Sequence, residues 1–279
     1  MIEKLSNSWK LFKASLAVLS ADKELLIFPI LSAIGTTILT ASFALPFILG
    51  GVFDTAFMGK IQPFVWLVTF GFYVFQYCVV FFANTALVGA AHIRLQGGDP
   101  TVADGFRIAW SRFGPILGYA LIAATVGMIL QIFNKKGKGF ARMIVSLIGF
   151  AWNVATYLVV PVLAIEGVGP IEAIKRSVAL LKATWGEQLT GNYGLGFLFG
   201  LVYLAAFLLA IPIVILALSQ QLWVIAAVVV GLFVLVLILI GLLHASLNGI
   251  YSAAVYEYAV TGKTSSFFES QMVTKAFQG

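Results

Sequence analysis

The segment Val160–Gly186, VPVLAIEGVGPIEAIKRSVALLKATWG, shows how the chain is organised. It begins as the end of an apolar run, is interrupted by Gly167, Gly169 and Pro170, and continues with apolar residues at helical spacing. Glycine and proline disfavour a continuing helix, so the interruption predicts a turn between two helices. The second helix would bury an apolar stripe and keep its charged face in water, as helices at a membrane surface do. The stripe consists of Ile171, Ile174, Val178, Leu181 and Trp185.

The composition of the chain is that of a membrane protein. Of its 279 residues, 61% are hydrophobic and 10% are charged, whereas soluble proteins carry roughly 25% charged residues. The charged residues cluster between apolar runs, each long enough to cross a hydrocarbon layer about 30 Å thick. The short alternating strands of a membrane barrel are not evident. The sequence therefore predicts one all-α membrane domain over residues 1–279, with about six transmembrane helices forming three hairpins.

The six apolar runs give the approximate limits of the spans. The last run is longer than a bilayer requires, so a break is expected at Gly241 or at Asn248-Gly249. The predicted spans are 25–52, 64–93, 114–133, 143–165, 189–218 and 222–260.

An amphipathic helix is predicted before each hairpin, over residues 1–24, 102–113 and 171–185, and a weaker one begins at Thr264. In the first of these helices Trp9 and Leu16 belong to the apolar stripe. The net charge of +6 comes from basic residues at membrane boundaries, which indicates anionic lipid headgroups as partners and no nucleic acid. The candidate lipid-contacting residues are Lys10, Lys13, Arg107, Arg112, Lys175, Arg176 and Lys182.

Two features predict an internal repeat. Residues 8–15 (SWKLFKAS) match residues 177–184 (SVALLKAT) in pattern and phase. Asn84, Asn153 and Asn248 each lie in the last half of an even-numbered span, about four turns before a glycine-containing break. We therefore expect three related units, followed by a terminal amphipathic tail. Their approximate limits are 1–99, 100–169, 170–263 and 264–279.

The distribution of basic residues predicts that both termini lie inside. The loop Lys135–Arg142 would then lie outside, against the positive-inside rule. This loop is either functional or a sign that the third and fourth spans are irregular.

Several motifs carry a family resemblance: residues 161–166 (PVLAIE), 172–177 (EAIKRS), 185–187 (WGE) and the opening from 8–9 (SW) through 21–29 (ADKELLIFP). With these motifs, nearly the whole chain resembles an uncharacterised family of prokaryotic six-span membrane proteins, a domain of unknown function. A looser likeness extends to the membrane domain found beside glycerophosphodiester phosphodiesterases, although we expect no soluble catalytic domain like theirs and no transfer of their activity. The resemblance implies a multi-pass fold in the cytoplasmic membrane, and it implies no chemistry.

A few polar residues stand within or beside the spans. His244, Asn248 and Tyr251 fall on one face of the sixth span, where they would serve either interhelical packing or a polar pathway. Glu166 would bind a cation or proton, cap the following helix, or form a salt bridge with Arg107 or Arg176.

Small residues predict close helix packing through Gly114-x-x-x-Gly118 and Gly196-x-x-x-Gly200. Neither histidine has a cysteine or carboxylate spaced to complete a zinc site, and Cys78 is the only cysteine. We expect no catalytic residues, no cofactor and no metal.

Three functional hypotheses remain. A non-enzymatic scaffold, packing with itself or with a membrane partner, fits the cationic faces and the repeat. A transporter or channel fits the interrupted helices, with a polar pathway near Asn248 and His244. The third hypothesis is an intramembrane enzyme that acts on lipid, although the sequence shows no credible pair of catalytic residues.

Overall fold

The computed structural model describes residues 2–49, 62–136, 140–185, 194–263 and 265–268. Lys138 and most of the predicted C-terminal tail lie outside these residues. The first predicted unit contains α1 (Ile2–Ala21), the 3-10 turn η1 (Lys23–Leu26), α2 (Ile27–Leu49) and α4 (Gln62–Leu95). The second contains α5 (Val102–Ser111), α6 (Phe113–Lys136), α7 (Phe140–Ala155) and α8 (Val159–Ile165). The third contains α9 (Pro170–Trp185), α10 (Gly194–Ser219) and α11 (Trp223–Thr261).

Within these ranges the protein is helical, and six segments are long and apolar enough to cross a membrane. They extend over residues 23–45, 65–95, 113–134, 142–165, 198–219 and 223–261. The predicted all-α, six-span fold is therefore confirmed.

Two spans differ from expectation. The fourth is interrupted by a turn at residues 156–158, which separates α7 from α8. The sixth is one continuous helix, α11, so the break expected at Gly241 or Asn248-Gly249 is wrong. Gly249 instead allows α11 to approach α4, because a methyl group at this position would lie 2.9 Å from Leu87 Cγ. Glycine at position 249 thus permits close packing of α11 against α4.

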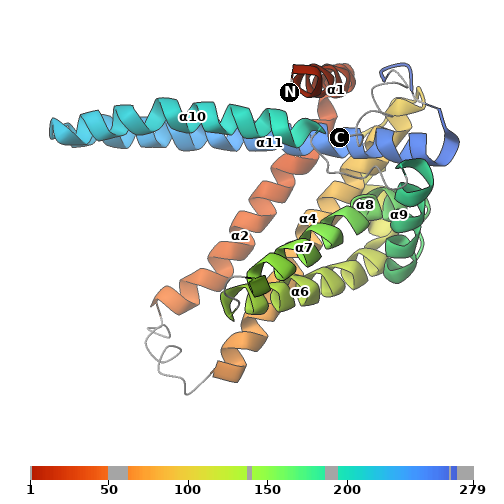
Figure 1. Ribbon diagram of the computed structural model, residues 1–279, viewed down its shortest axis with the longest axis horizontal. Helices are drawn as coiled ribbons and strands as arrows, with labels where there is room; N and C mark the ends of the chain where they lie inside the picture. The colour runs from red at the N-terminus through yellow and green to blue at the C-terminus, as the bar shows by residue number, and fades with distance from the viewer. Residues whose placement is uncertain (1, 50–61, 137–139, 186–193, 264, 269–279) are drawn as a thin grey trace.

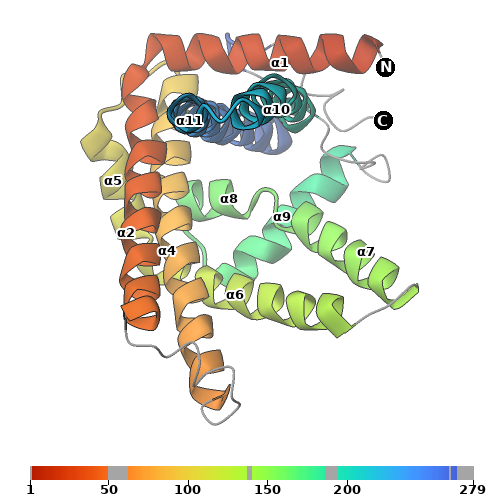
Figure 2. The same cartoon turned by 90° about the vertical axis from the view of Figure 1, so that its left-hand side faces the viewer.

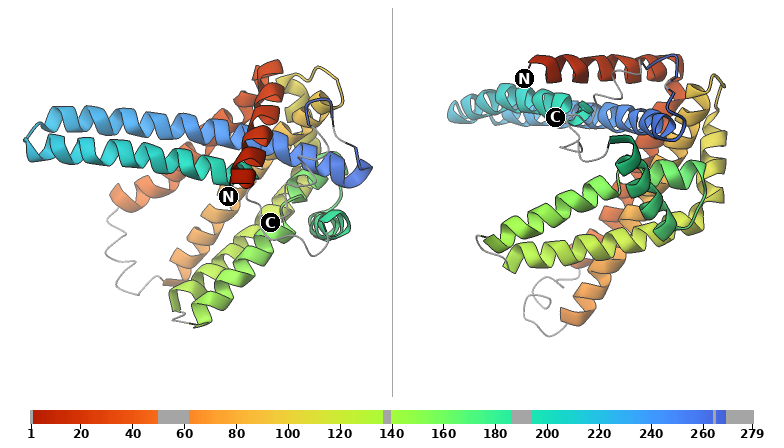
Figure 3. Two further views of the ribbon diagram at one scale, coloured as in Figure 1. Left: turned by 45° about the horizontal axis from the view of Figure 1, so that its top comes forward. Right: turned by 45° about the vertical axis from the view of Figure 1, so that its right-hand side comes forward.

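The three hairpins extend from a common base and diverge toward their tips (Figure 1). The α10–α11 hairpin points in a different direction from α2 and α4, as the view along it shows (Figure 2). The α6–α7 hairpin takes a third direction, while α1 crosses near the base of α10 and α11 (Figure 3).

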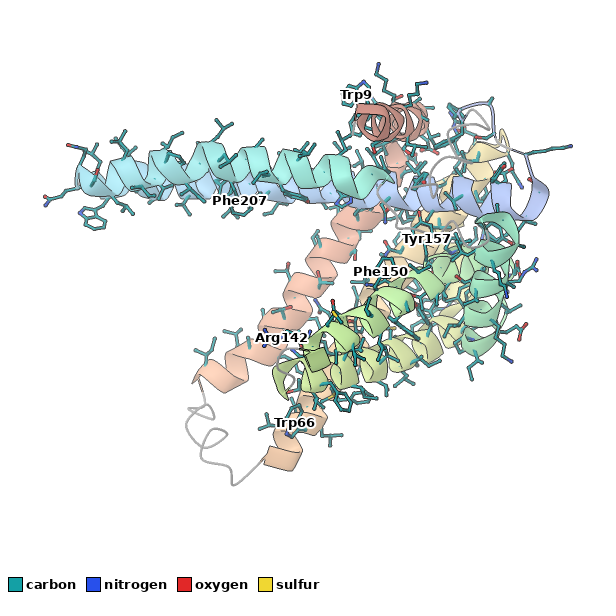
Figure 4. The ribbon with its side chains drawn as sticks, viewed as in Figure 1. Trp9, Trp66, Arg142, Phe150, Tyr157 and Phe207 are labelled. Atoms are coloured by element: carbon teal, nitrogen blue, oxygen red, sulfur yellow. The ribbon has the colours of Figure 1, made fainter. Side chains whose placement is uncertain are left out.

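The best-packed part of the molecule is this base, which we call the hub. Its core joins α1, the end of α4, α8 and the end of α11 through fully buried side chains such as Leu11, Leu87, Leu163 and Tyr251. The outer parts of the hairpins leave apolar side chains exposed, 70% at Leu209 and 78% at Val224. Figure 4 shows such side chains projecting along α10 and α11.

The short helices bury faces shifted from the predicted stripes. In α1, Leu11, Ser15 and Val18 are buried, whereas Trp9 is 47% exposed. In α9, Ser177 is buried and Ile171 is 62% exposed. Small and medium-sized residues let the short helices pack closely on the hub. The larger apolar side chains of these helices stay exposed on the outer surface. Placement of these helices at the membrane surface stays a prediction.

Each even-numbered span ends at a glycine in the left-handed conformation. The φ angles are 89° at Gly97, 68° at Gly167 and 69° at Gly262, after α4, α8 and α11 respectively. Their N–H groups bond to carbonyls of the preceding turn. Glycine adopts this conformation without the strain that a Cβ introduces, so these residues end the helices at defined positions.

Candidate functional site at the hub

Glu166 joins three elements at the end of α8. Its Oε1 lies 2.9 Å from Nε of Arg176 on α9, and it also accepts a hydrogen bond of 2.9 Å from the Tyr256 hydroxyl on α11. The bond to Glu166 and its charge raise the pKa of Arg176. Of the alternatives open at Glu166, the structure shows the ion pair with Arg176. Arg107 is instead paired with Asp104 on its own helix, at 3.1 Å.

Arg112 belongs to the same side of the hub. Its guanidinium lies against the backbone of Gly167, where an added methyl group would overlap it. The side chain is half-buried. The left-handed turn at Gly167 therefore serves two purposes, because it ends α8 and leaves room for Arg112.

A second polar cluster links the start of the chain to the second unit. Arg94 Nη1 donates to Asp99 Oδ1 at 3.0 Å, and its Nη2 donates to the carbonyl of Ala21 at 3.1 Å. Glu24 accepts the N–H of Val102 at 3.0 Å, the first residue of α5. These bonds fix the ends of α1 and α4 relative to the start of α5.

Asp22 lies beside this cluster and is buried, with only 7% of its surface exposed. Burial raises the pKa of its carboxyl group, although a backbone N–H at Glu24 and the charge of Arg94 act in the opposite direction. Sequence reasoning did not single out Asp22 or Arg94. The only signal was that charged residues flank a short turn.

The polar residues of the sixth span have different surroundings. His244 stacks on Phe199 with ring centroids 4.3 Å apart. Tyr251 is fully buried, and Asn248 is exposed. Asn84 is half-buried and Asn153 is exposed. Within the described ranges these three amides form no hydrogen bond that joins them to another helix.

The glycine pairs also differ among themselves. A methyl group on Gly118 would lie 2.9 Å from Pro170 of α9, so this glycine packs closely. Gly114, Gly196 and Gly200 have open space where a side chain would lie. Of the candidate lipid-contacting cations, Lys10, Lys13, Lys175 and Lys182 are exposed, and Lys13 Nζ lies 5.6 Å from the centre of the Trp9 ring.

His92 lies at the hub near the end of α4. Its ring Nε2 is 3.0 Å from the Gln96 amide nitrogen, and its edge faces Tyr256. Across the residues that the structure describes, no group of three His, Cys, Asp or Glu side chains is placed to hold a metal ion. Some polar groups of the hub bond across helix ends, as Glu166 does with Arg176 and Tyr256, an arrangement suited to holding helix ends at fixed angles.

The helices, their apolar surfaces and the polar hub define a multi-pass all-α membrane protein. More specifically, the chain belongs to a family of unknown function, DUF6159, whose model matches residues 64–267. The likeness to the membrane domain beside glycerophosphodiester phosphodiesterases is not shown by this match. Comparison with curated proteins and with solved structures found no match.

Proposed function

We propose that the protein is a non-enzymatic membrane scaffold, which anchors its hub on anionic lipid and uses its hairpins to pack with copies of itself or with a membrane partner. The observation that carries this proposal is the apolar surface of the α10–α11 hairpin. In the described chain α10 packs on α11 and α1. Leu209, Ile215 and Val224 are among its exposed apolar side chains.

The use of the polar groups supports the same proposal. Glu166 bonds to Arg176 and Tyr256, and Arg94 bonds to Asp99 and to backbone carbonyls. Each set joins the ends of different helices. Groups satisfied in this way serve to fix the directions of the hairpins, as a scaffold requires.

The exposed cations would provide the lipid anchor. Lys10, Lys175 and Lys182 lie on the short helices and point away from the core. Each such charge near an anionic membrane surface contributes about 1 kcal/mol. Arg176 is a weaker candidate because its side chain is only 43% exposed and holds Glu166 within the hub. A cytoplasmic membrane location with both termini inside is part of this proposal.

One observation favours a transporter or channel as a second candidate. The fourth span is broken between α7 and α8, and discontinuous helices are common around transport sites. The polar pathway would then lie near Asn248 and His244.

A flux assay separates the two candidates. The purified protein and its Asn84→Ala, Asn153→Ala and Asn248→Ala variants would be reconstituted in liposomes for ion and solute flux, and melted in detergent. The scaffold predicts no protein-dependent flux and little change in melting temperature, because among the described residues these three amides form no hydrogen bond to another helix. A flux that Asn248→Ala abolishes, with an unchanged melting temperature, would overturn the scaffold.

A further inference from the structure

An apolar groove of about 300 Å³ lies at the base of the first hairpin, between α2, α4, α5 and the first residue of α6. We call it the α5 groove. Its volume is at the lower end of the range for ligand pockets, roughly 300–1,000 Å³. The side chains that line the groove include Leu31, Ser32, Cys78, Phe82, Trp110 and Phe113.

Close packing of α5 defines the groove. A methyl group on Gly105 would lie 2.8 Å from the carbonyl oxygen of Ala86 and would overlap the Phe28 ring, so glycine brings α5 onto α2 and α4. Aromatic rings then form the wall. The centroid of Phe82 lies 6.0 Å from Trp110 and 6.4 Å from Phe113.

The position of the groove decides what can enter it. It is lined by the spans 23–45 and 65–95, whose outer surfaces face the hydrocarbon of the membrane. The polar groups among its lining side chains are the Ser32 hydroxyl, the Cys78 thiol and the Trp110 indole N–H. A polar solute would therefore exchange its hydration for few hydrogen bonds there, whereas a hydrocarbon chain has no such bonds to lose.

Arg107 is not a lining residue, but it lies one helical turn before the lining residue Trp110 on α5, so it can supply charge beside the groove. The Arg107 side chain is 77% exposed, and Trp110 on the next turn is 70% exposed. Arg107 uses Nη1 to bond Asp104, and a guanidinium has five N–H donors, so others are left for a phosphate. Tryptophan is typical of the membrane–water boundary.

We propose that the α5 groove binds one anionic phospholipid, with an acyl chain against Phe82 and Cys78 and the phosphate at Arg107. The proposal goes beyond the scaffold, because a lipid seated here is compatible with a transporter as well. It names a specific site, in contrast to the diffuse attraction of surface lysines.

The test uses phosphatidylglycerol that carries a photoreactive diazirine on one acyl chain, in vesicles containing the full chain. After irradiation, mass spectrometry locates the adducts. We expect them to concentrate on the segments of α2, α4 and α5 that line the groove, and to be competed by unlabelled phosphatidylglycerol. Even labelling along all hairpins, without competition, would overturn the proposal.

Two variants sharpen the test. Ser32→Phe fills the groove and should reduce its adducts about tenfold, which corresponds to about 1.4 kcal/mol of binding free energy. The matched control is Ser42→Phe, which puts the same ring at an exposed position of α2 and should leave the adducts unchanged.

Headgroup recognition is tested with Arg107→Gln, an exposed site where loss of folding is not expected. The variant should lower phosphatidylglycerol labelling to the level of a phosphatidylcholine probe and leave the latter unchanged. Equal labelling by both lipids in the unmodified protein would contradict recognition of an anionic lipid. Melting temperatures of all three variants confirm that each is folded.

Discussion

Asp22 is an acid buried where α1 ends, and its environment makes its charge unfavourable. Burial raises the pKa of its carboxyl group above the ordinary value of 3.8. The folded protein therefore binds this proton more tightly than the unfolded chain does. The resulting stabilisation is complete below pH 3.8 and is lost as pH rises through the folded pKa.

We expect Asp22→Asn to raise the melting temperature in detergent at pH 7, because the amide removes a buried charge. The gain should shrink as pH falls toward 4, where Asp22 itself becomes neutral. Thermal unfolding followed by circular dichroism between pH 4 and pH 7 measures both effects. A gain that grows in acid would contradict this account of Asp22.

Asp104 provides a control of opposite sign. Bonds from the hydroxyl and N–H of Thr101 lower the pKa of its carboxyl group. Its stabilisation is present above the unfolded pKa and is lost as pH falls through the folded pKa. Asp104→Asn should therefore lower the melting temperature at pH 7 and have less effect in acid.

At the residue scale, the sequence located some contacts and missed others. Glu166 stood beside a turn, and Arg176 followed it by ten residues on the next predicted helix, so their ion pair was among the alternatives. Tyr256 and Asp22 were not foreseen. Tyr256 bonds to Glu166 at the end of α8, and Asp22 lies near Arg94 of α4. Both partners are remote in the sequence, and no local pattern indicates such contacts.

At the element scale, the break between α7 and α8 is stabilised by a side chain from a third helix. The Leu158 N–H donates a hydrogen bond of 3.1 Å to Ser177 Oγ of α9. Both residues are fully buried. An N–H left without a partner in such a place costs about 1–3 kcal/mol.

Ser177→Ala should therefore destabilise the protein by about that amount. Ser111→Ala is the matched control, because Ser111 is exposed and bonds only to Ile108 O of its own helix. Unfolding of both variants in detergent provides the comparison, and hydrogen exchange at residues 156–160 should rise only in Ser177→Ala. Equal effects of the two changes would show that the bond has no special role.

The spans themselves were predictable because apolar length is a strong signal. The break at residues 156–158 was not, since these residues lie within an apolar run and the acceptor that supports the break comes from α9. The opposite error occurred in α11, where glycine suggested a kink. Gly249 instead permits contact with Leu87, and sequence spacing does not distinguish these two uses of glycine.

At the scale of the whole molecule, the hairpins point away from the hub in different directions (Figure 1), and the six-span topology predicts that all three tips emerge on one side of the membrane. Single cysteines at Lys136 and Gln220, in a Cys78→Ser background, should react with an impermeant thiol reagent in intact cells. A cysteine at Lys263, beyond the hub end of α11, should react only after lysis. Labelling of Lys136 and Gln220 on different sides would contradict the six-span topology.

The internal repeat remains a prediction, although the three units share structural features. Each even-numbered span ends in a left-handed glycine, at Gly97, Gly167 and Gly262. The two residues aligned from the sequence, Ser8 and Ser177, are both buried. A pattern of small residues in the sequence could suggest these shared positions, whereas the different directions of the hairpins depend on contacts within the hub.

The packing of α1 has a consequence for how the chain is made. This first helix buries Leu11 and Val18 against a hub to which α10 and α11 contribute. During synthesis from the N-terminus, its partners are therefore the last to leave the ribosome. The early hairpins must reside in the bilayer before the hub closes, and closure waits for the final span. The N-terminal helix α1 can therefore pack into its final position only after the whole chain has been made. The last step of folding is thus late and cooperative.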